Sequence, residues 1–311
     1  LSGNIESAER TFGFAKQLCK KFKHTGTKNA VLATLAWSFR GMSSVSVAQK
    51  IKQNLTKDFT WAPMGYLIEG RALIVNGNHK EGLASVEQGC GLLIERMGEA
   101  ADVFFAPILL DSYIQTRNVD KGIAMANYLY NKSTALNMES MTGRAALLRK
   151  KATFLIMKKY PDFVPEICRA TPLDSTPIQD LLNIPELPNS STLTLDDDAL
   201  LGLGTPKFDP LSSSIVRTLA SISDCDDIEV LLQTAMKLCQ SRELYTAELM
   251  CRIDMARYYL HCGDTNRAME TAELLKDSCM KLKATEKSRE LKRAKMIIAS
   301  IEEAKWTSNL N

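Results

Sequence analysis

Apolar residues recur along this chain with a period of about 3.6 residues, and alternating patterns long enough for a β-strand are absent. This period places apolar side chains along one stripe of an α-helix, so the sequence predicts an all-α fold. The predicted helices cover residues 4–23, 28–41, 43–54, 61–76, 79–97, 99–116, 119–136, 141–159, 161–169, 212–222, 226–241, 243–262, 265–283 and 286–305.

A turn pattern recurs between these helices about every 40 residues. A helix ends on a glycine or a polar turn, and a small residue follows five positions later near the start of the next helix. The pattern occupies residues 3–8, 77–82, 117–122 and 263–268. Gly, Asn and Asp tolerate the left-handed backbone that ends a helix, and Asn and Asp also cap the next one. The predicted antiparallel hairpins are 61–76 with 79–97, 99–116 with 119–136, and 243–262 with 265–283.

Repetition at a fixed period predicts a right-handed α-solenoid, in which each helix hairpin buries its apolar face on its neighbours. Residues 171–210 interrupt the pattern, because they hold six of the ten prolines of the chain. Proline removes backbone donors, so we expect a partly ordered insertion or linker there. The expected organisation is repeats in 1–170, the insertion in 171–210, and repeats with a C-terminal capping helix in 211–311.

Charge and hydropathy argue against two classes of partner. The net charge is only +3 for 311 residues, and the densest basic run, Lys281 to Lys295, is interrupted by Glu286 and Glu290. Such a balance does not create the basic groove of a nucleic-acid-binding protein. No apolar run approaches the roughly 18–20 residues that span a bilayer. We therefore expect no nucleic-acid partner and no membrane insertion.

The eight cysteines and three histidines of the chain are scattered, without a CxxC pair or a ligand cluster. This pattern favours reduced thiols in a cytoplasmic protein and predicts no metal site. The chain begins at Leu1 without an initiator methionine or a signal-like leader. We expect it to be a part of a longer protein.

Three short motifs could suggest a dinucleotide site, a catalytic pair and a calcium site, but each has a simpler interpretation. Gly202-Leu203-Gly204 is too short for a dinucleotide fingerprint and lies in the proline-rich stretch. His261 and Cys262 are consecutive, so on a helix their side chains diverge by about 100°. Asp196-Asp197-Asp198 lacks the spacing of an EF-hand. We expect no catalytic residue and no cofactor in this segment.

Small and large residues keep fixed distances from the turn glycines. Gly70 and Ala256 lie seven positions before Gly77 and Gly263, and large residues lie four positions before the turns, at Leu73, Tyr113 and Tyr259. This resembles the tetratricopeptide repeat, which implies close helix pairs with a large residue between repeats. The resemblance is to a degenerate form, because Leu110 replaces the small residue in one hairpin, the terminal proline is missing and the period exceeds 34 residues.

A narrower resemblance covers about 61–157 and 240–303. It rests on residues 61–66, Gly70, 72–73, 77–83, 104–105, 109–110, Tyr113, 123–124, 241–244, 247–248, 256–257, 263–264 and Ala268. Their order is similar to the C-terminal repeat region of large signalling proteins that carry an AAA-like regulatory ATPase, often with a class III nucleotide cyclase or a DNA-binding domain. The resemblance implies such a parent, although this segment contains neither a Walker A sequence nor the metal-binding aspartate pair of a cyclase.

In a tetratricopeptide-like hairpin the first helix lines a groove. By the spacing above, the groove positions are Arg71, Asp111, Gln115, Arg257 and His261. We expect them to bind protein partners or other domains of the parent chain, so that the segment is a non-catalytic scaffold or sensor arm of a larger cytosolic signalling protein. The alternatives are a structural subunit of a stable multi-protein assembly and a repeat domain that binds a small ligand.

Overall fold

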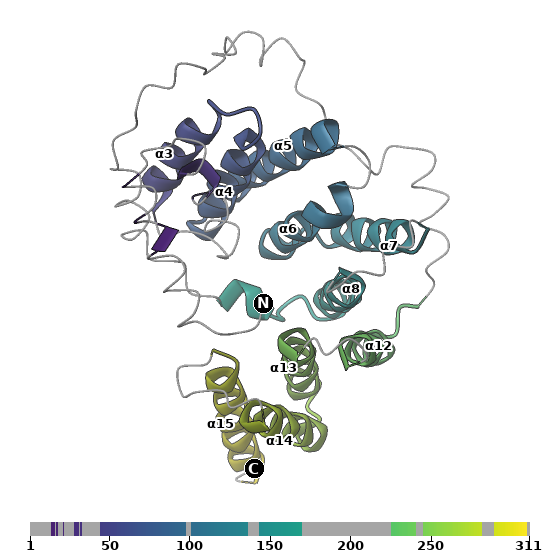
Figure 1. Cartoon of the computed structure of the whole chain (residues 1–311). Helices are drawn as coiled ribbons and strands as arrows, with labels where there is room; N and C mark the ends of the chain where they lie inside the picture. Colours follow the sequence, from purple (N-terminus) through teal and green to yellow (C-terminus); the bar gives the residue numbers. More distant parts are fainter. Residues whose placement is uncertain are drawn as a thin grey trace. The chain divides into compact units, whose positions relative to one another are not determined.

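The computed structural model describes residues 44–97, 101–135, 143–169, 225–240, 245–281 and 289–309, together with a few positions between 14 and 32 (Figure 1). All regular structure in these ranges is helical. The helices are α3 (Val45–Leu55), α4 (Ala62–Val75), α5 (His79–Met97), α6 (Ala101–Gln115), α7 (Val119–Ala135), α8 (Gly143–Lys159), η1 (Glu166–Arg169), α12 (Ile228–Gln240), α13 (Tyr245–His261), α14 (Thr265–Lys281) and α15 (Arg289–Asn309). The expected all-α class is confirmed for this part of the chain.

One expected helix differs from the structure, and several others cannot be compared with it. The expected helix 161–169 is wrong, because only Glu166–Arg169 forms a short 3-10 helix. Pro161 and Pro165 explain the difference, since proline removes a backbone donor and disfavours helical backbone in the residue before it. The expected helices at 4–23, 28–41 and 212–222 and the insertion at 171–210 lie largely or wholly outside the described residues.

The chain divides into two compact units, which are considered separately. The α3–α6 unit contains residues 4–118 and 167–213, and the α7–α15 unit contains residues 1–3, 119–166 and 214–311. The expected organisation into 1–170, 171–210 and 211–311 stays a prediction. The expected hairpin of 99–116 with 119–136 spans both units and stays a prediction.

In the α3–α6 unit each helix packs on the next, and α4 also contacts α6. The seam between α4 and α5 is built from glycines. A Cβ atom on Gly70 would lie 2.5 Å from the carbonyl oxygen of Gly82, and one on Gly89 would lie 2.9 Å from the carbonyl oxygen of Pro63. The two backbones approach this closely because no side chain separates them. The expected close approach at Gly70 is confirmed.

Three helices end in the same backbone turn. Gly77, Arg117 and Gly263 have φ of 91°, 57° and 78°. The amide of each donates to the carbonyl three residues earlier, and the next amide donates to the carbonyl five residues before it, as in Asp264 to Tyr259 at 2.9 Å. This is the Schellman pattern, which satisfies the free carbonyls of a helix end. The sequence therefore located these helix ends correctly.

In the α7–α15 unit, α8 packs on α7, α12 and α13, and α14 lies between α13 and α15 (Figure 1). The ring of Phe154 on α8 fills the space beside Gly122 on α7, where a Cβ would come within 2.1 Å of the ring. On the other side, Arg149 of α8 pairs with Asp254 of α13 at 3.2 Å. Packing of α8 on α12 joins two helices that are separated in the sequence by residues 160–227.

Candidate functional site

The C-terminal half of α13 packs side chains against the segment 160–165. Arg257 donates from Nη2 to the carbonyl oxygen of Val164 at 2.8 Å, and its guanidinium lies 5.8 Å from the centre of the Phe163 ring. The imidazole of His261 meets the rings of Tyr160 and Phe163 edge-on, with centres 5.0 and 5.5 Å away. We call Tyr160, Phe163, Arg257, Tyr258 and His261 the α13 cluster.

Local sequence explains why these groups meet. Arg257 and His261 are four residues apart on α13, so they share one face of the helix. Tyr160 directly follows α8, and Pro161 ends helical hydrogen bonding there. The short segment that follows turns Phe163 inward, where it is 5% exposed, and leaves Asp162 outside. The Oδ1 of Asp162 lies 3.4 Å from Nε2 of His261.

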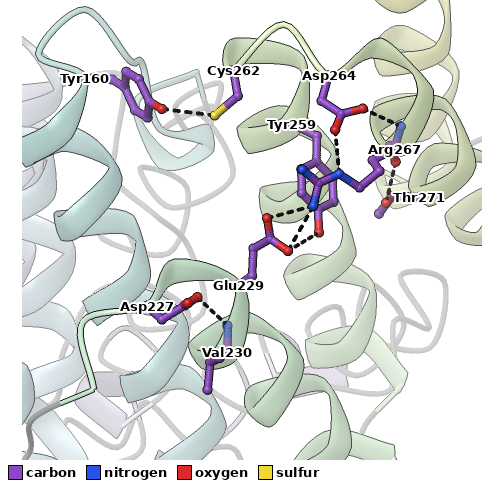
Figure 2. A network of polar contacts seen from close by, with 9 residues as sticks. All are labelled: Tyr160, Asp227, Glu229, Val230, Tyr259, Cys262, Asp264, Arg267 and Thr271. Atoms are coloured by element: carbon purple, nitrogen blue, oxygen red, sulfur yellow. Dashed lines mark hydrogen bonds and ion pairs between the residues drawn. The ribbon is translucent and has the colours of Figure 1, made fainter.

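A polar network lies beside the cluster at the turn between α13 and α14 (Figure 2). The hydroxyl of Tyr259 donates to Oε2 of Glu229 at 3.1 Å, and Nη1 of Arg267 binds Oε1 of Glu229 at 2.9 Å. The same guanidinium lies 4.5 Å from the centre of the Tyr259 ring and binds Asp264 through Nε at 2.5 Å. One arginine therefore links α12, α13 and the start of α14.

The surroundings shift the pKa of three residues in this region. Hydrogen bonds from the backbone amide and the side chain of Arg267 lower the pKa of Asp264. Burial, followed by the charge of Glu229, raises the pKa of Tyr259, and burial together with neighbouring Cys262 raises the pKa of Tyr258. The two phenols keep their protons at neutral pH, so they act there as hydrogen-bond donors. This arrangement supplies groups for recognition through charge, hydrogen bonds and aromatic surface.

The thiol of Cys262 donates to the hydroxyl oxygen of Tyr160 at 3.2 Å (Figure 2). Neighbouring His261 instead directs its ring toward Tyr160 and Phe163 and its Nε2 toward Asp162. Tyr160 is therefore a shared neighbour of these two consecutive residues, through its hydroxyl for Cys262 and through its ring for His261. Within the described residues, no group of three or more His, Cys, Asp and Glu side chains is arranged to hold a metal ion.

The five residues expected to line a groove have different surroundings. Arg257 and His261 lie together in the α13 cluster, and both are half-buried. Asp111 and Gln115 are half-buried on α6, in the other unit. The place of Arg71 in a partner-binding groove stays a prediction, and its side chain is only 7% exposed. The reason is that α3, α5 and α6 all pack on α4 and leave that helix little free surface.

Sequence reasoning missed several members of this region. Asp162 and Phe163 were expected in a helix over 161–169, although Pro161 and Pro165, which flank them, were the available signal. Tyr160 lay between two expected helices and was given no role. Glu229 gave no signal by itself, because the repeat pattern is interrupted before α12. The other unit contains a hydrogen bond of the same kind. Tyr113, at the turn position equivalent to Tyr259, donates to Glu87 of α5 at 3.1 Å. A tyrosine bound to a glutamate of the preceding helix therefore occurs in both units.

Comparison with known proteins returns no match, whether with family models, with curated protein sequences or with solved structures. The described part of the chain has no helix with both the length and the apolar character needed to cross a membrane. The assignment of a role therefore depends on the geometry above.

Proposed function

We propose that this chain is a non-catalytic helical-repeat segment that binds protein partners, as a scaffold or sensor arm of a larger cytosolic signalling protein. The supporting pattern is the repeated Schellman turn with a tyrosine–glutamate hydrogen bond, together with packing of most described helices on the next helix along the chain. Such near-neighbour packing is typical of repeat proteins. A right-handed α-solenoid is the arrangement that we propose for the whole chain.

The observation that carries the binding role is the α13 cluster. It combines an arginine, a histidine and aromatic rings on one helix face and the adjoining segment. Arginine and tyrosine are enriched among the residues that dominate protein–protein binding energy, because they offer large contact area with defined polar ends. The half-buried side chains of Arg257 and His261 have partners within the chain, so the surface is organised before a partner binds.

Affinity capture from the native cell extract tests this role. We expect Tyr160→Ala and His261→Ala to reduce recovery of the specific partner at least several-fold, with circular dichroism spectra matching those of the wild type. Glu270→Ala is the matched control, since Glu270 is an exposed residue of α14 in the same unit. Equal recovery of every partner by all variants would contradict the assignment of the α13 cluster as the binding surface.

A parent with a regulatory ATPase or a nucleotide cyclase is part of the same proposal and comes from the resemblance of the repeat region. The flanking gene sequence tests it directly. A P-loop or cyclase domain upstream would support the sensor-arm role, and a parent without either would contradict it.

One observation favours a second candidate, a structural subunit of a stable assembly. Leu274 and Met280 on α14 and Met296 on α15 are 47%, 55% and 68% exposed. Exposed apolar side chains of this size suit burial by another chain, although single ones are common on monomers. Light scattering on the purified protein and on the Met296→Lys variant separates the two roles. A stable complex in the wild type that dissociates in the variant supports the assembly subunit.

A further inference from the structure

Two cysteines meet in the α7–α15 unit, apart from the α13 cluster. Cys239 lies in the last turn of α12, Cys251 lies in the first half of α13, and these two helices pack on each other. Their side chains are 0% and 1% exposed, and their thiols are hydrogen-bonded to each other. Both are free thiols in this structure. The fold therefore holds two sulfur atoms side by side across a helix interface.

The surroundings make the two thiols unequal. The hydrogen bond from Cys251 lowers the pKa of Cys239, and the positive charge of Arg149 lowers it further. Burial and the charge of Glu248 raise this pKa, but they do not cancel the lowering. The same hydrogen bond, together with burial, raises the pKa of Cys251 well above its usual value. Arg149 is held in place by its ion pair with Asp254 at 3.2 Å. Cys239 therefore ionises to a thiolate more readily than Cys251, and the Cys251 thiol keeps its proton.

Cys90 on α5 is the natural comparison within the chain. It is also buried, with 1% exposure, but burial and then the charge of Glu87 raise its pKa to about 12. A thiol with that pKa has almost no thiolate at neutral pH and is a poor nucleophile. Burial alone therefore does not produce the arrangement around Cys239.

We propose that Cys239 and Cys251 form a reversible disulfide when the protein meets a hydroperoxide. The Cys239 thiolate attacks one peroxide oxygen and breaks the O–O bond, which gives a sulfenic acid and, after the departing oxygen takes a proton, water or an alcohol. The Cys251 thiol then attacks the sulfenic sulfur, the S–O bond breaks, and a second water leaves with the thiol proton. Two thiols are oxidised, and one peroxide is reduced.

The position of Cys239 provides a route for the oxidant. It is the penultimate residue of α12, and helix ends open locally without unfolding of the rest of a domain. Opening of this last turn exposes the sulfur to a small peroxide. The disulfide then ties the end of α12 to α13, the helix that carries Arg257 and His261. Oxidation would stabilise the helix pair next to the proposed binding surface.

The test exposes the full chain to hydrogen peroxide, blocks remaining thiols under denaturing conditions and maps peptides by mass spectrometry. We expect a peptide linked through Cys239 and Cys251 that dithiothreitol removes, and a higher melting temperature for the oxidised protein. Cys90→Ser is the matched control, which should keep the linkage. Absence of the linked peptide, or a lower melting temperature after it forms, would overturn the proposal.

Single variants test the two roles separately. In Cys251→Ala, a sulfenic acid should accumulate at Cys239 and react with dimedone, because the second thiol is missing. In Cys239→Ala, dimedone should not label Cys251. Labelling of Cys251 as fast as of Cys239 would overturn the assignment of Cys239 as the attacking thiol. If the alanine variants lose helical circular dichroism, Cys239→Ser and Cys251→Ser, which keep the side-chain size, replace them and must give the same two results.

Discussion

At the residue scale, the backbone of three helix ends demands a left-handed conformation, and two of them meet it with glycine. Gly77 and Gly263 have φ of 91° and 78°, whereas Arg117 has φ of 57°. A side chain at positive φ brings its Cβ close to the following carbonyl oxygen, which costs about 1 kcal/mol or more. Arg117 therefore retains a local strain that the two glycines avoid.

Arg117→Gly should stabilise the protein by about 0.5–1 kcal/mol, because relief of this strain exceeds the added entropy of a glycine in the unfolded chain. Urea unfolding followed by circular dichroism measures the change. Arg117→Ala is the control, since it removes the same side-chain contacts but keeps a Cβ at positive φ. If the glycine variant is no more stable than the alanine variant, the positive φ of residue 117 does not strain the backbone.

Asp264 predicts a dependence of stability on acid pH. Its pKa is lowered in the folded state by the backbone amide and then the side chain of Arg267, so ionised Asp264 stabilises the fold. That contribution is present above the unfolded pKa of about 3.9 and is lost as pH falls through the lower folded value.

Asp264→Asn keeps a side chain that caps a helix but removes the charge. It should therefore be less stable than the wild type at neutral pH, and the difference should shrink as pH falls below about 4. Denaturant midpoints measured from neutral to acid pH check this. A difference that stays constant with pH would show that the cap, and not the charge, stabilises this turn.

At the scale of elements, two kinds of helix contact use glycine differently. Gly70 and Gly82 let the backbones of α4 and α5 touch, whereas Gly122 leaves a space on α7 that the Phe154 ring of α8 fills. The first contact is backbone against backbone, so it cannot yield to an added methyl group. The second is backbone against a well-packed ring in the core.

Gly70→Ala should destabilise the protein by about 1–3 kcal/mol, because the added Cβ would lie 2.5 Å from the Gly82 oxygen and force the helices apart. Thermal or urea unfolding measures the loss. Gly143→Ala at the start of α8 is the matched control, since a Cβ there meets nothing within 4 Å. Gly143→Ala should be neutral or slightly stabilising. Similar losses of stability in both variants would contradict the close backbone contact between α4 and α5.

At the scale of the whole molecule, the α7–α15 unit is assembled from distant stretches of sequence. Its α8 contacts α12 and α13, which follow it only after residue 225. Arg149 of α8 and Asp254 of α13, at 12–18% exposure of their side chains, form an ion pair within this packing. Removal of one member of a largely buried pair leaves a charge without its partner, so this contact makes the packing specific.

Fragments 1–169 and 225–311, produced together, should associate, because each presents apolar helix faces that the other covers. Co-elution in size-exclusion chromatography measures this. Arg149→Ala should weaken the complex several-fold, since it removes the ion pair with Asp254. Lys158→Ala is the control, because its ion pair with Asp120 is exposed and lies within the first fragment. Two folded fragments that elute separately would contradict the prediction.

Local sequence determined the helices and their ends. The 3.6-residue period placed most helices within a few residues, and Gly77 and Gly263 marked turns that do have positive φ. These features depend on neighbours within a few positions, so one sequence is enough to find them. The 161–169 segment was missed because its two prolines were outweighed by its apolar residues.

Only the tertiary structure decided which helices meet and which charges are covered. It packed α8 on α12, buried Arg71 on α4, and brought Arg257 and His261 to the rings of Tyr160 and Phe163. The same packing placed Cys239 against Cys251. Contacts between distant segments depend on how whole helix faces fit together, and a periodic pattern shows which face is apolar but not which face covers it.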